Sequence, residues 1–280
     1  TMLINGIGQP FTPDAYGYIV RMFNGDNISY ALGDASTAYC GISNIRLWKR
    51  SFEKYHLTQT PENGFGETPL KKYRRHIFLL HPNKVVIYDE LEANEKVRWD
   101  WLLHSPVKFD INPAASILTT VNKEKGFSSV VQLFCEQEAA ITQTDKYAAP
   151  PNHADAQRGE DFTDPWSLTA SFGPSRNNRI LTIIQVEADG RQAVQIMREG
   201  NTFRCGEWVI EAELNAKRPG RLYIRNSRNN AVFSYGDKKP EINGELYSCK
   251  EKDASVLFDC VNGEWTVQEM GDQRVQTMGK

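Results

Sequence analysis

The stretch YRRHIFLLHPNKVVIYDEL, residues 73–91, decides the fold of this chain of 280 residues. It contains two segments, 73–80 and 84–91, that are rich in Val, Ile, Tyr and Phe. Both follow the two-residue side-chain period of a β-strand, and residues of this kind favour the half-buried surface of a sheet. The stretch therefore predicts two neighbouring strands.

The same pattern recurs along the chain. Further period-2 segments lie at 17–23, 97–104, 130–135, 180–186, 207–213, 221–225 and 256–260. Turn signals such as Asn24-Gly25 and Asn243-Gly244 separate many of them. The chain is therefore predicted to be all-β, a large antiparallel β-sandwich of the supersandwich type that forms one domain over residues 1–280.

Few segments lack this strand-like alternation. No window longer than about three turns keeps a capped helical stripe, so only residues 45–54 are expected to hold a short helix. The polar stretches 51–69 and 147–165 are expected to be long loops, each either a lid or a simple excursion.

Composition excludes several classes of function. With 33 Lys plus Arg against 35 Asp plus Glu, the formal charge is -2, so no overall basic field exists for nucleic acid or an anionic membrane. No apolar run approaches the roughly 18 residues of a membrane helix. The five cysteines lack the paired short spacing of a zinc ribbon. The strand-like start TMLIN, which has no signal-peptide pattern, is expected to continue a longer polypeptide.

Asp34 is the first residue that requires an explanation. Counting by twos from Ile28 places it on the same strand face as Tyr30 and Leu32, where an unpaired carboxylate would cost several kcal/mol. Its partner is expected to be a helix-like turn, a cation or a metal. His76 lies on a similar apolar face, so either the two side chains belong to a zinc site or His76 is a core histidine that bonds to Asp34 or to the backbone.

Other candidates carry weaker signals. His104, in WDWLLHS, is a ligand, an oriented base or a histidine at a strand end. Lys71, Lys72, Arg74 and Arg75 form the one dense basic cluster, but strand alternation divides it between two faces, so at most half of it converges on one ligand. The cluster is either a charged sheet edge that discourages strand pairing or a site for carboxylate or sulfate.

Four strings taken together resemble the C-terminal β-sandwich domain of the heparinase II/III-like polysaccharide lyases. They are TMLINGIGQ (1–9), GDASTAY (33–39), YRRHIFLLHPNKVVIYDELEA (73–93) and WLLHS (101–105). In that family a His-Asn pair precedes the first string, and here it would fall before Thr1. The resemblance thus implies a part of a longer enzyme, whose N-terminal α/α toroid domain lies upstream.

The resemblance also implies a chemistry and a set of residues. Such enzymes cleave uronate-containing acidic glycans, for example heparan sulfate or alginate, by β-elimination, in the bacterial periplasm or at the cell surface. Asp34 and His76 look like two ligands of the family's zinc, with the third expected upstream of Thr1 and His104 as the runner-up. Tyr39 and Tyr55 are the candidates for a catalytic tyrosine.

Two other functions stay open at this stage. A non-catalytic carbohydrate-binding or scaffold domain would line its concave face with aromatic residues. A mutarotase-like epimerase would need a His and a Glu that converge on that face. Because most catalytic groups of the lyase family come from the toroid, the chain alone is expected to be inactive.

Overall fold

The computed structural model describes residues 1–43, 49, 52–112, 114, 116–147, 165–188, 191–226, 231–236, 239–242, 244–250 and 254–272. Within these residues the regular structure is almost entirely β, and two large antiparallel sheets account for most of it. The expected helix at 45–54 and the loop at 147–165 lie mostly outside the described residues. The loop at 51–69 holds, in its described part, the short 3-10 helix η1 (Pro61–Asn63).

The larger sheet has ten strands in the described chain. They are β1 (Met2–Ile4), β2 (Tyr18–Asn24), β3 (Ile28–Asp34), β4 (Leu70–Leu80), β5 (Lys84–Ser105), β6 (Asp110–Asn112), β7 (Ile117–Asn122), β8 (Phe127–Phe134), β9 (Ala140–Thr144) and β10 (Trp166–Ala188). Their order is β2-β3-β4-β5-β10-β8-β7-β6, while β1 pairs with β5 and β9 with β10. The two long strands β5 and β10 run side by side and form the spine of the sheet.

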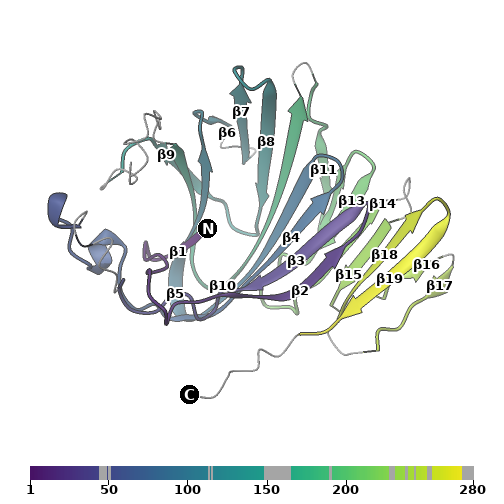
Figure 1. Cartoon of the computed structure of the whole chain (residues 1–280), viewed down its shortest axis with the longest axis horizontal. Coiled ribbons are helices and arrows are strands. Elements are labelled where there is room, and N and C mark those ends of the chain that lie inside the picture. The colour runs from purple at the N-terminus through teal and green to yellow at the C-terminus, as the bar shows by residue number, and fades with distance from the viewer. Residues whose placement is uncertain are drawn as a thin grey trace.

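The smaller sheet follows later in the chain and has seven strands within the described residues. They are β11 (Ile196–Glu199), β12 (Thr202–Cys205), β13 (Trp208–Ala212), β14 (Leu222–Asn226), β15 (Ala231–Tyr235), β18 (Ser255–Val261) and β19 (Glu264–Met270). A separate ribbon pairs β16 (Glu241–Ile242) with β17 (Glu245–Leu246). Figure 1 shows the seven-strand sheet beside β2, β3 and β4.

The main hydrophobic core lies between the two sheets. Alternate residues of the larger sheet, such as Phe78 and Tyr88, meet Trp208 and Phe233 of the smaller sheet, and all four are buried. Burying each large apolar side chain contributes about 1.5–3 kcal/mol. This contact explains why strands with one apolar face fold into a two-layer sandwich.

A second core lies on the opposite face of the ten-strand sheet. Trp99 and Trp101 of β5 pack there in one cluster with Leu118 of β7 and Leu168 of β10. Since strands at distant positions in the sheet contribute to one cluster, the sheet must curl around this face, and Figure 1 shows that curvature. We call this face, which is turned away from the seven-strand sheet, the open face. The predicted all-β antiparallel sandwich is confirmed.

Candidate functional site

The carboxylate of Asp34 forms an ion pair with Arg74. In the β3–β4 register Leu32 lies opposite His76 and Asp34 lies opposite Arg74, so all four side chains share the face that meets the smaller sheet. Arg74 Nε donates to Asp34 Oδ2 at 3.0 Å, and the backbone N–H of Ser36 donates to Asp34 Oδ1 at 3.0 Å. The shared face is confirmed, and the partner of the carboxylate is a cation.

His76 takes different partners from Asp34. The imidazole is fully buried, with Nε2 3.1 Å from Glu90 Oε1 and Nδ1 3.0 Å from the Tyr30 hydroxyl. An ionised Glu90 only accepts, so His76 donates through Nε2 and accepts from Tyr30 at Nδ1. Burial lowers the pKa of His76, which keeps the ring neutral at neutral pH. The expected hydrogen bond between Asp34 and His76 is replaced by these contacts.

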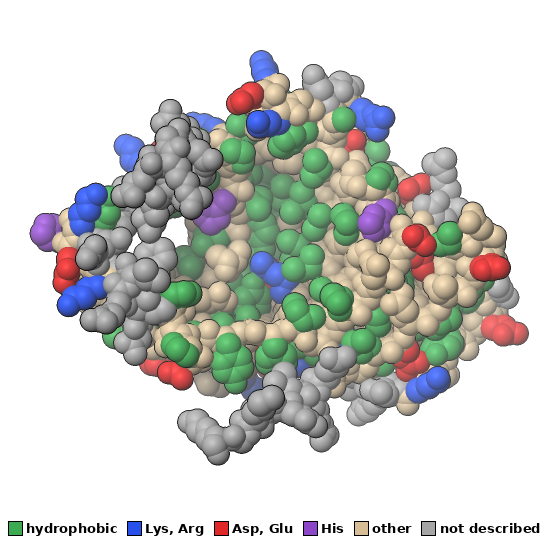
Figure 2. Space-filling model, in the orientation of Figure 1, with side chains coloured by type: hydrophobic (Ala, Val, Ile, Leu, Met, Phe, Trp, Pro, Cys, Tyr) green, Lys and Arg blue, Asp and Glu red, His purple; other side chains and the backbone are tan. Residues whose placement is uncertain are grey.

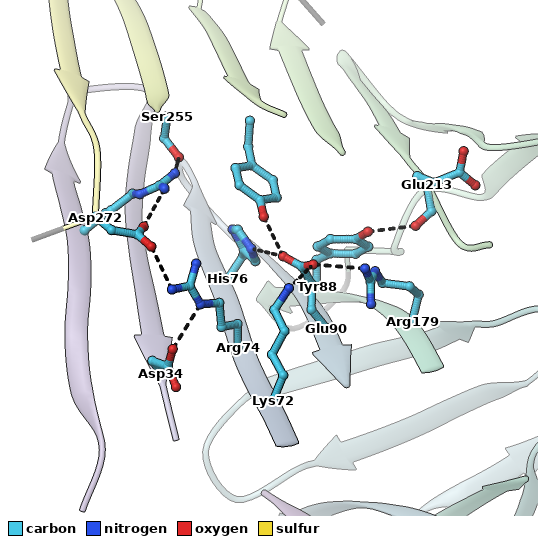
Figure 3. Close-up of polar contacts among 12 residues, drawn as sticks. Asp34, Lys72, Arg74, His76, Tyr88, Glu90, Arg179, Glu213, Ser255 and Asp272 are labelled. Atoms are coloured by element: carbon cyan, nitrogen blue, oxygen red, sulfur yellow. Dashed lines mark hydrogen bonds and ion pairs between the residues drawn. The ribbon is translucent and has the colours of Figure 1, made fainter. Parts of the chain in front are cut away.

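Glu90 is the centre of a buried polar cluster, shown in Figure 3. In addition to His76, the Tyr235 hydroxyl donates to it at 2.7 Å, Lys72 Nζ at 3.0 Å and Arg179 Nη2 at 3.1 Å. Burial alone would raise the pKa of Glu90, but the hydrogen bond from His76 and the charges of Arg179 and Lys72 outweigh it and hold the pKa far below its usual range. The ionised carboxylate thus holds strands of both sheets together.

These residues do not fit a zinc ion as they stand. Both ring nitrogens of His76 and both carboxylate oxygens of Asp34 are already in hydrogen bonds. Across the described part of the chain, no group of three His, Cys, Asp or Glu side chains lies ready to hold a metal. Zinc ligation by Asp34, His76 or His104 therefore stays a prediction for a longer protein that adds a ligand.

Arg75 lies on the open face, opposite to Arg74, as strand alternation predicts. Its Nε and Nη2 donate to the two oxygens of Asp89 at 2.7 and 2.9 Å, and its guanidinium lies 5.5 Å from the centre of the Tyr73 ring. A bidentate pair of this kind holds the guanidinium rigidly. The two candidate substrate-binding arginines cannot meet on one ligand.

The open face is otherwise apolar across its middle. One row of cross-strand neighbours runs from Met22 through Ala31 and Ile77 to Ile87, and the next row joins Leu79 to Val85. Several of its large apolar side chains are exposed: Ile19, Met22, Ile77, Leu79, Phe127 and Val186. Figure 2 shows hydrophobic side chains gathered in a central hollow of the molecular surface. Exposed apolar side chains gathered on one face are typical of an interaction site.

The two candidate tyrosines differ in accessibility. Tyr39 is buried, its hydroxyl donates to the carbonyl oxygen of Met2 at 2.7 Å, and burial raises its pKa well above the usual value. Tyr55 is half-buried, with the ammonium of Lys54 5.1 Å above its ring. His104 is exposed near the far end of β5, opposite Ser167. The structure does not bring these three residues to the Glu90 cluster.

The sequence carried a signal for Glu90 that was not used. Counting by twos from Val86 through Tyr88 places Glu90 on the same apolar face, the reasoning that singled out Asp34. Arg179 carried the same signal, because counting by twos back from Ile183 through Leu181 places it on that face too. Asp272 carried no such signal, since it reaches Arg74 across 198 residues of sequence.

The chain is thus a two-sheet antiparallel β-sandwich with a buried charged cluster on one side of its larger sheet and an apolar surface on the other. No protein-family model matches it, and no curated protein does. Its fold is similar to two heparinase III structures, with TM-scores of 0.51 and 0.50 and identities of 10% and 12% over 93% and 80% of the chain. A heparan sulfate lyase from Pedobacter heparinus matches 81% of it at 7% identity, with a TM-score of 0.49.

The matched region is one part of those larger proteins. The chain spans 29% of each of the two heparinase III chains and 30% of the heparan sulfate lyase chain. The expected likeness to a β-sandwich domain of heparinase-like lyases is therefore confirmed at the level of fold. In the described part of the chain, no helix is long and apolar enough to cross a membrane.

Proposed function

We propose that this chain is the β-sandwich part of a larger polysaccharide lyase that cleaves uronate-containing acidic glycans by β-elimination. An α/α toroid domain of the same protein supplies the remaining catalytic groups, and the enzyme works in the bacterial periplasm or at the cell surface. The observation that carries the proposal is the fold likeness to heparinase III over 93% of the chain at a TM-score of 0.51. The four sequence strings that resemble the heparinase II/III-like family support it independently.

The open face supports the need for a second domain. Exposed side chains such as Ile77, Leu79 and Met22 leave apolar surface in contact with water on strands that are otherwise well packed. Covering that surface with another domain would recover roughly 25 cal/mol for each Å² removed from water. A toroid packed over this face would also place Arg75 at the boundary between the domains.

Two residues of the chain, Arg75 and Tyr55, are candidates for a direct role in the reaction. Proton abstraction from C5 of a uronate requires a neutralised carboxylate and a group that moves protons. On the open face Arg75 is a cation suited to the first task, because its pair with Asp89 uses Nε and Nη2. Of the two tyrosines, Tyr55 is the better candidate for the second, because Tyr39 is buried.

The test is a comparison of the 280-residue chain with the longer protein on heparan sulfate, alginate and chondroitin. We expect the longer protein to generate the ultraviolet absorbance of an unsaturated uronate on at least one glycan, and the chain alone to generate none. In the longer protein Tyr55→Phe should lower kcat more than the matched variant Tyr39→Phe. Turnover by the chain alone would place the catalytic centre inside the sandwich and contradict the proposal.

A non-catalytic carbohydrate-binding or scaffold domain is the alternative, favoured by one observation. The His76, Tyr235, Lys72 and Arg179 side chains all bond to the buried carboxylate of Glu90, so the His76–Glu90 pair is not free for acid–base chemistry. Glycan binding by the longer protein without unsaturated product would support this alternative. The mutarotase-like reading needs an accessible His–Glu pair, but His76 and Glu90 meet inside the sandwich, where both are buried.

A further inference from the structure

Arg21 and Arg74 converge on a single carboxylate at one edge of the sandwich. Asp272, in the segment after β19, accepts from Arg21 Nη2 through Oδ1 and from Arg74 Nη2 through Oδ2 at 2.7 Å. Figure 3 shows Asp272 between Arg74 and the arginine that bonds Ser255. Two guanidinium groups that share one carboxylate form the geometry in which proteins bind carboxylate and sulfate groups.

Each arginine is also held by groups other than Asp272. Arg21 is 2% exposed, its Nη1 donates to Ser255 Oγ at 2.8 Å, and its guanidinium lies 5.6 Å from the centre of the Tyr235 ring. Arg74 is held by Asp34 through its Nε. The two donors that point at Asp272 therefore keep their positions without it.

Asp272 itself is the most exposed member of the group. Its side chain is 42% exposed, whereas Arg21 is buried and Arg74 is 22% exposed. It follows the last strand, so its removal from the arginines breaks no strand pairing. Without it, the guanidinium of Arg21 would be left buried with no carboxylate beside it, which is costly unless another anion enters.

We propose that Arg21 and Arg74 form a binding site for a carboxylate or sulfate group, which Asp272 occupies as a built-in competitor. The biological ligand rests on the proposed function, since an acidic glycan carries both kinds of group. The site itself rests only on the geometry of the two arginines. Displacement of Asp272 from the two arginines would open the site to a carboxylate or sulfate from outside the chain.

The test uses simple anions and the 280-residue chain, so it is independent of any lyase activity. Asp272→Ala is compared with the wild type and with Glu124→Ala, which removes an exposed carboxylate from the ion pair with Lys125. The thermal unfolding midpoint is followed against sodium sulfate and against sodium glucuronate, with sodium chloride keeping the ionic strength constant. Because sulfate stabilises most proteins non-specifically, the two reference proteins define the baseline.

We expect a saturable rise of the midpoint in Asp272→Ala with sulfate, glucuronate or both, and the two series distinguish which group is preferred. A tethered carboxylate competes at an effective concentration in about the millimolar range, so its removal should lower the apparent Kd by about tenfold or more. Adding Arg74→Gln to Asp272→Ala should abolish the saturable response.

Two results would overturn the proposal. One is an anion response of Asp272→Ala that follows the wild type and Glu124→Ala. The other is a response that survives in the variant that also carries Arg74→Gln, since the anion would then bind elsewhere. If Asp272→Ala does not fold in chloride, Asp272→Asn replaces it. If neither variant folds in chloride, recovery of the fold in sulfate is expected, and its failure counts against the site.

Discussion

The two faces of the ten-strand sheet are built on opposite principles. On the face that meets the smaller sheet, Glu90 and His76 are buried and their polar atoms are bonded within the protein. On the open face, apolar side chains such as Ile77 and Leu79 remain exposed. The buried polar residues around Glu90 therefore stabilise the sandwich. The surface left for a partner is the apolar open face.

The largest expected effect comes from breaking the buried cluster. Glu90→Ala leaves Lys72 and Arg179 without their shared carboxylate, so we expect the free energy of unfolding to fall by about 3–5 kcal/mol. Glu92→Ala is the matched control on the same strand, because Glu92 is 29% exposed and pairs with Lys71 near the surface. It should cost about 1 kcal/mol or less. Denaturant unfolding measures both, and equal losses would show that burial of the Glu90 carboxylate does not set the cost of its removal.

Alanine substitutions at two glycines, Gly220 beside Glu90 and Gly33 on the open face, should also differ in their cost to stability. A Cβ added at Gly220 would collide with the carboxylate of Glu90, whereas a Cβ at Gly33 on the open face meets no atom within 4 Å. Gly220→Ala should therefore cost about 1–3 kcal/mol through overpacking. Gly33→Ala should be neutral or slightly stabilising, because glycine weakens a strand interior. A neutral Gly220→Ala would mean that the cluster has room to adjust.

The sequence predicted strands such as β3 and β4 because their alternation identifies a strand whatever its neighbour. It did not single out β15, which is buried at all five positions and shows no alternation. It placed Asp34 and His76 on one face correctly, but alternation does not give the register between two strands. In the structure Asp34 lies opposite Arg74, and His76 lies two residues further along, opposite Leu32. Contacts between distant segments, such as that of Asp272 with Arg74, depend on the tertiary fold. Alternation identifies the face of a residue, and only the assembled sheets identify its partner.

The buried cluster should also make the fold sensitive to acid. Because burial lowers the folded pKa of His76 below its ordinary value of 6.5, the unfolded chain takes up a proton that the folded chain excludes. Stability should therefore fall as pH decreases below about 6.5, by up to about 1.4 kcal/mol per pH unit for this group. The depressed pKa of Glu90 adds a further loss at lower pH, as its carboxylate is protonated.

Substitution of the histidine tests this assignment. His76→Gln should flatten the dependence of the unfolding free energy on pH between about 7 and 5, although the variant is less stable overall. His104→Gln, on an exposed histidine at the far end of β5, should change that slope less. A slope that is the same in wild type and His76→Gln would show that other groups carry the acid sensitivity.

The smallest expected effect on stability belongs to the open face. Ile77→Thr and Leu79→Thr keep the strand while removing apolar surface that is 42% and 37% exposed, so each should change the unfolding free energy by about 1 kcal/mol or less. Phe78→Ala, between them on the sandwich side, removes a fully buried ring and should cost about 3–5 kcal/mol. In a longer protein that carries the toroid, the two threonine variants should instead weaken the packing of the second domain, measured as earlier unfolding or easier proteolysis between domains. Losses above about 2 kcal/mol from Ile77→Thr in the chain alone would mean that this face is already covered, and the division between a self-sufficient face and an interaction face would fail.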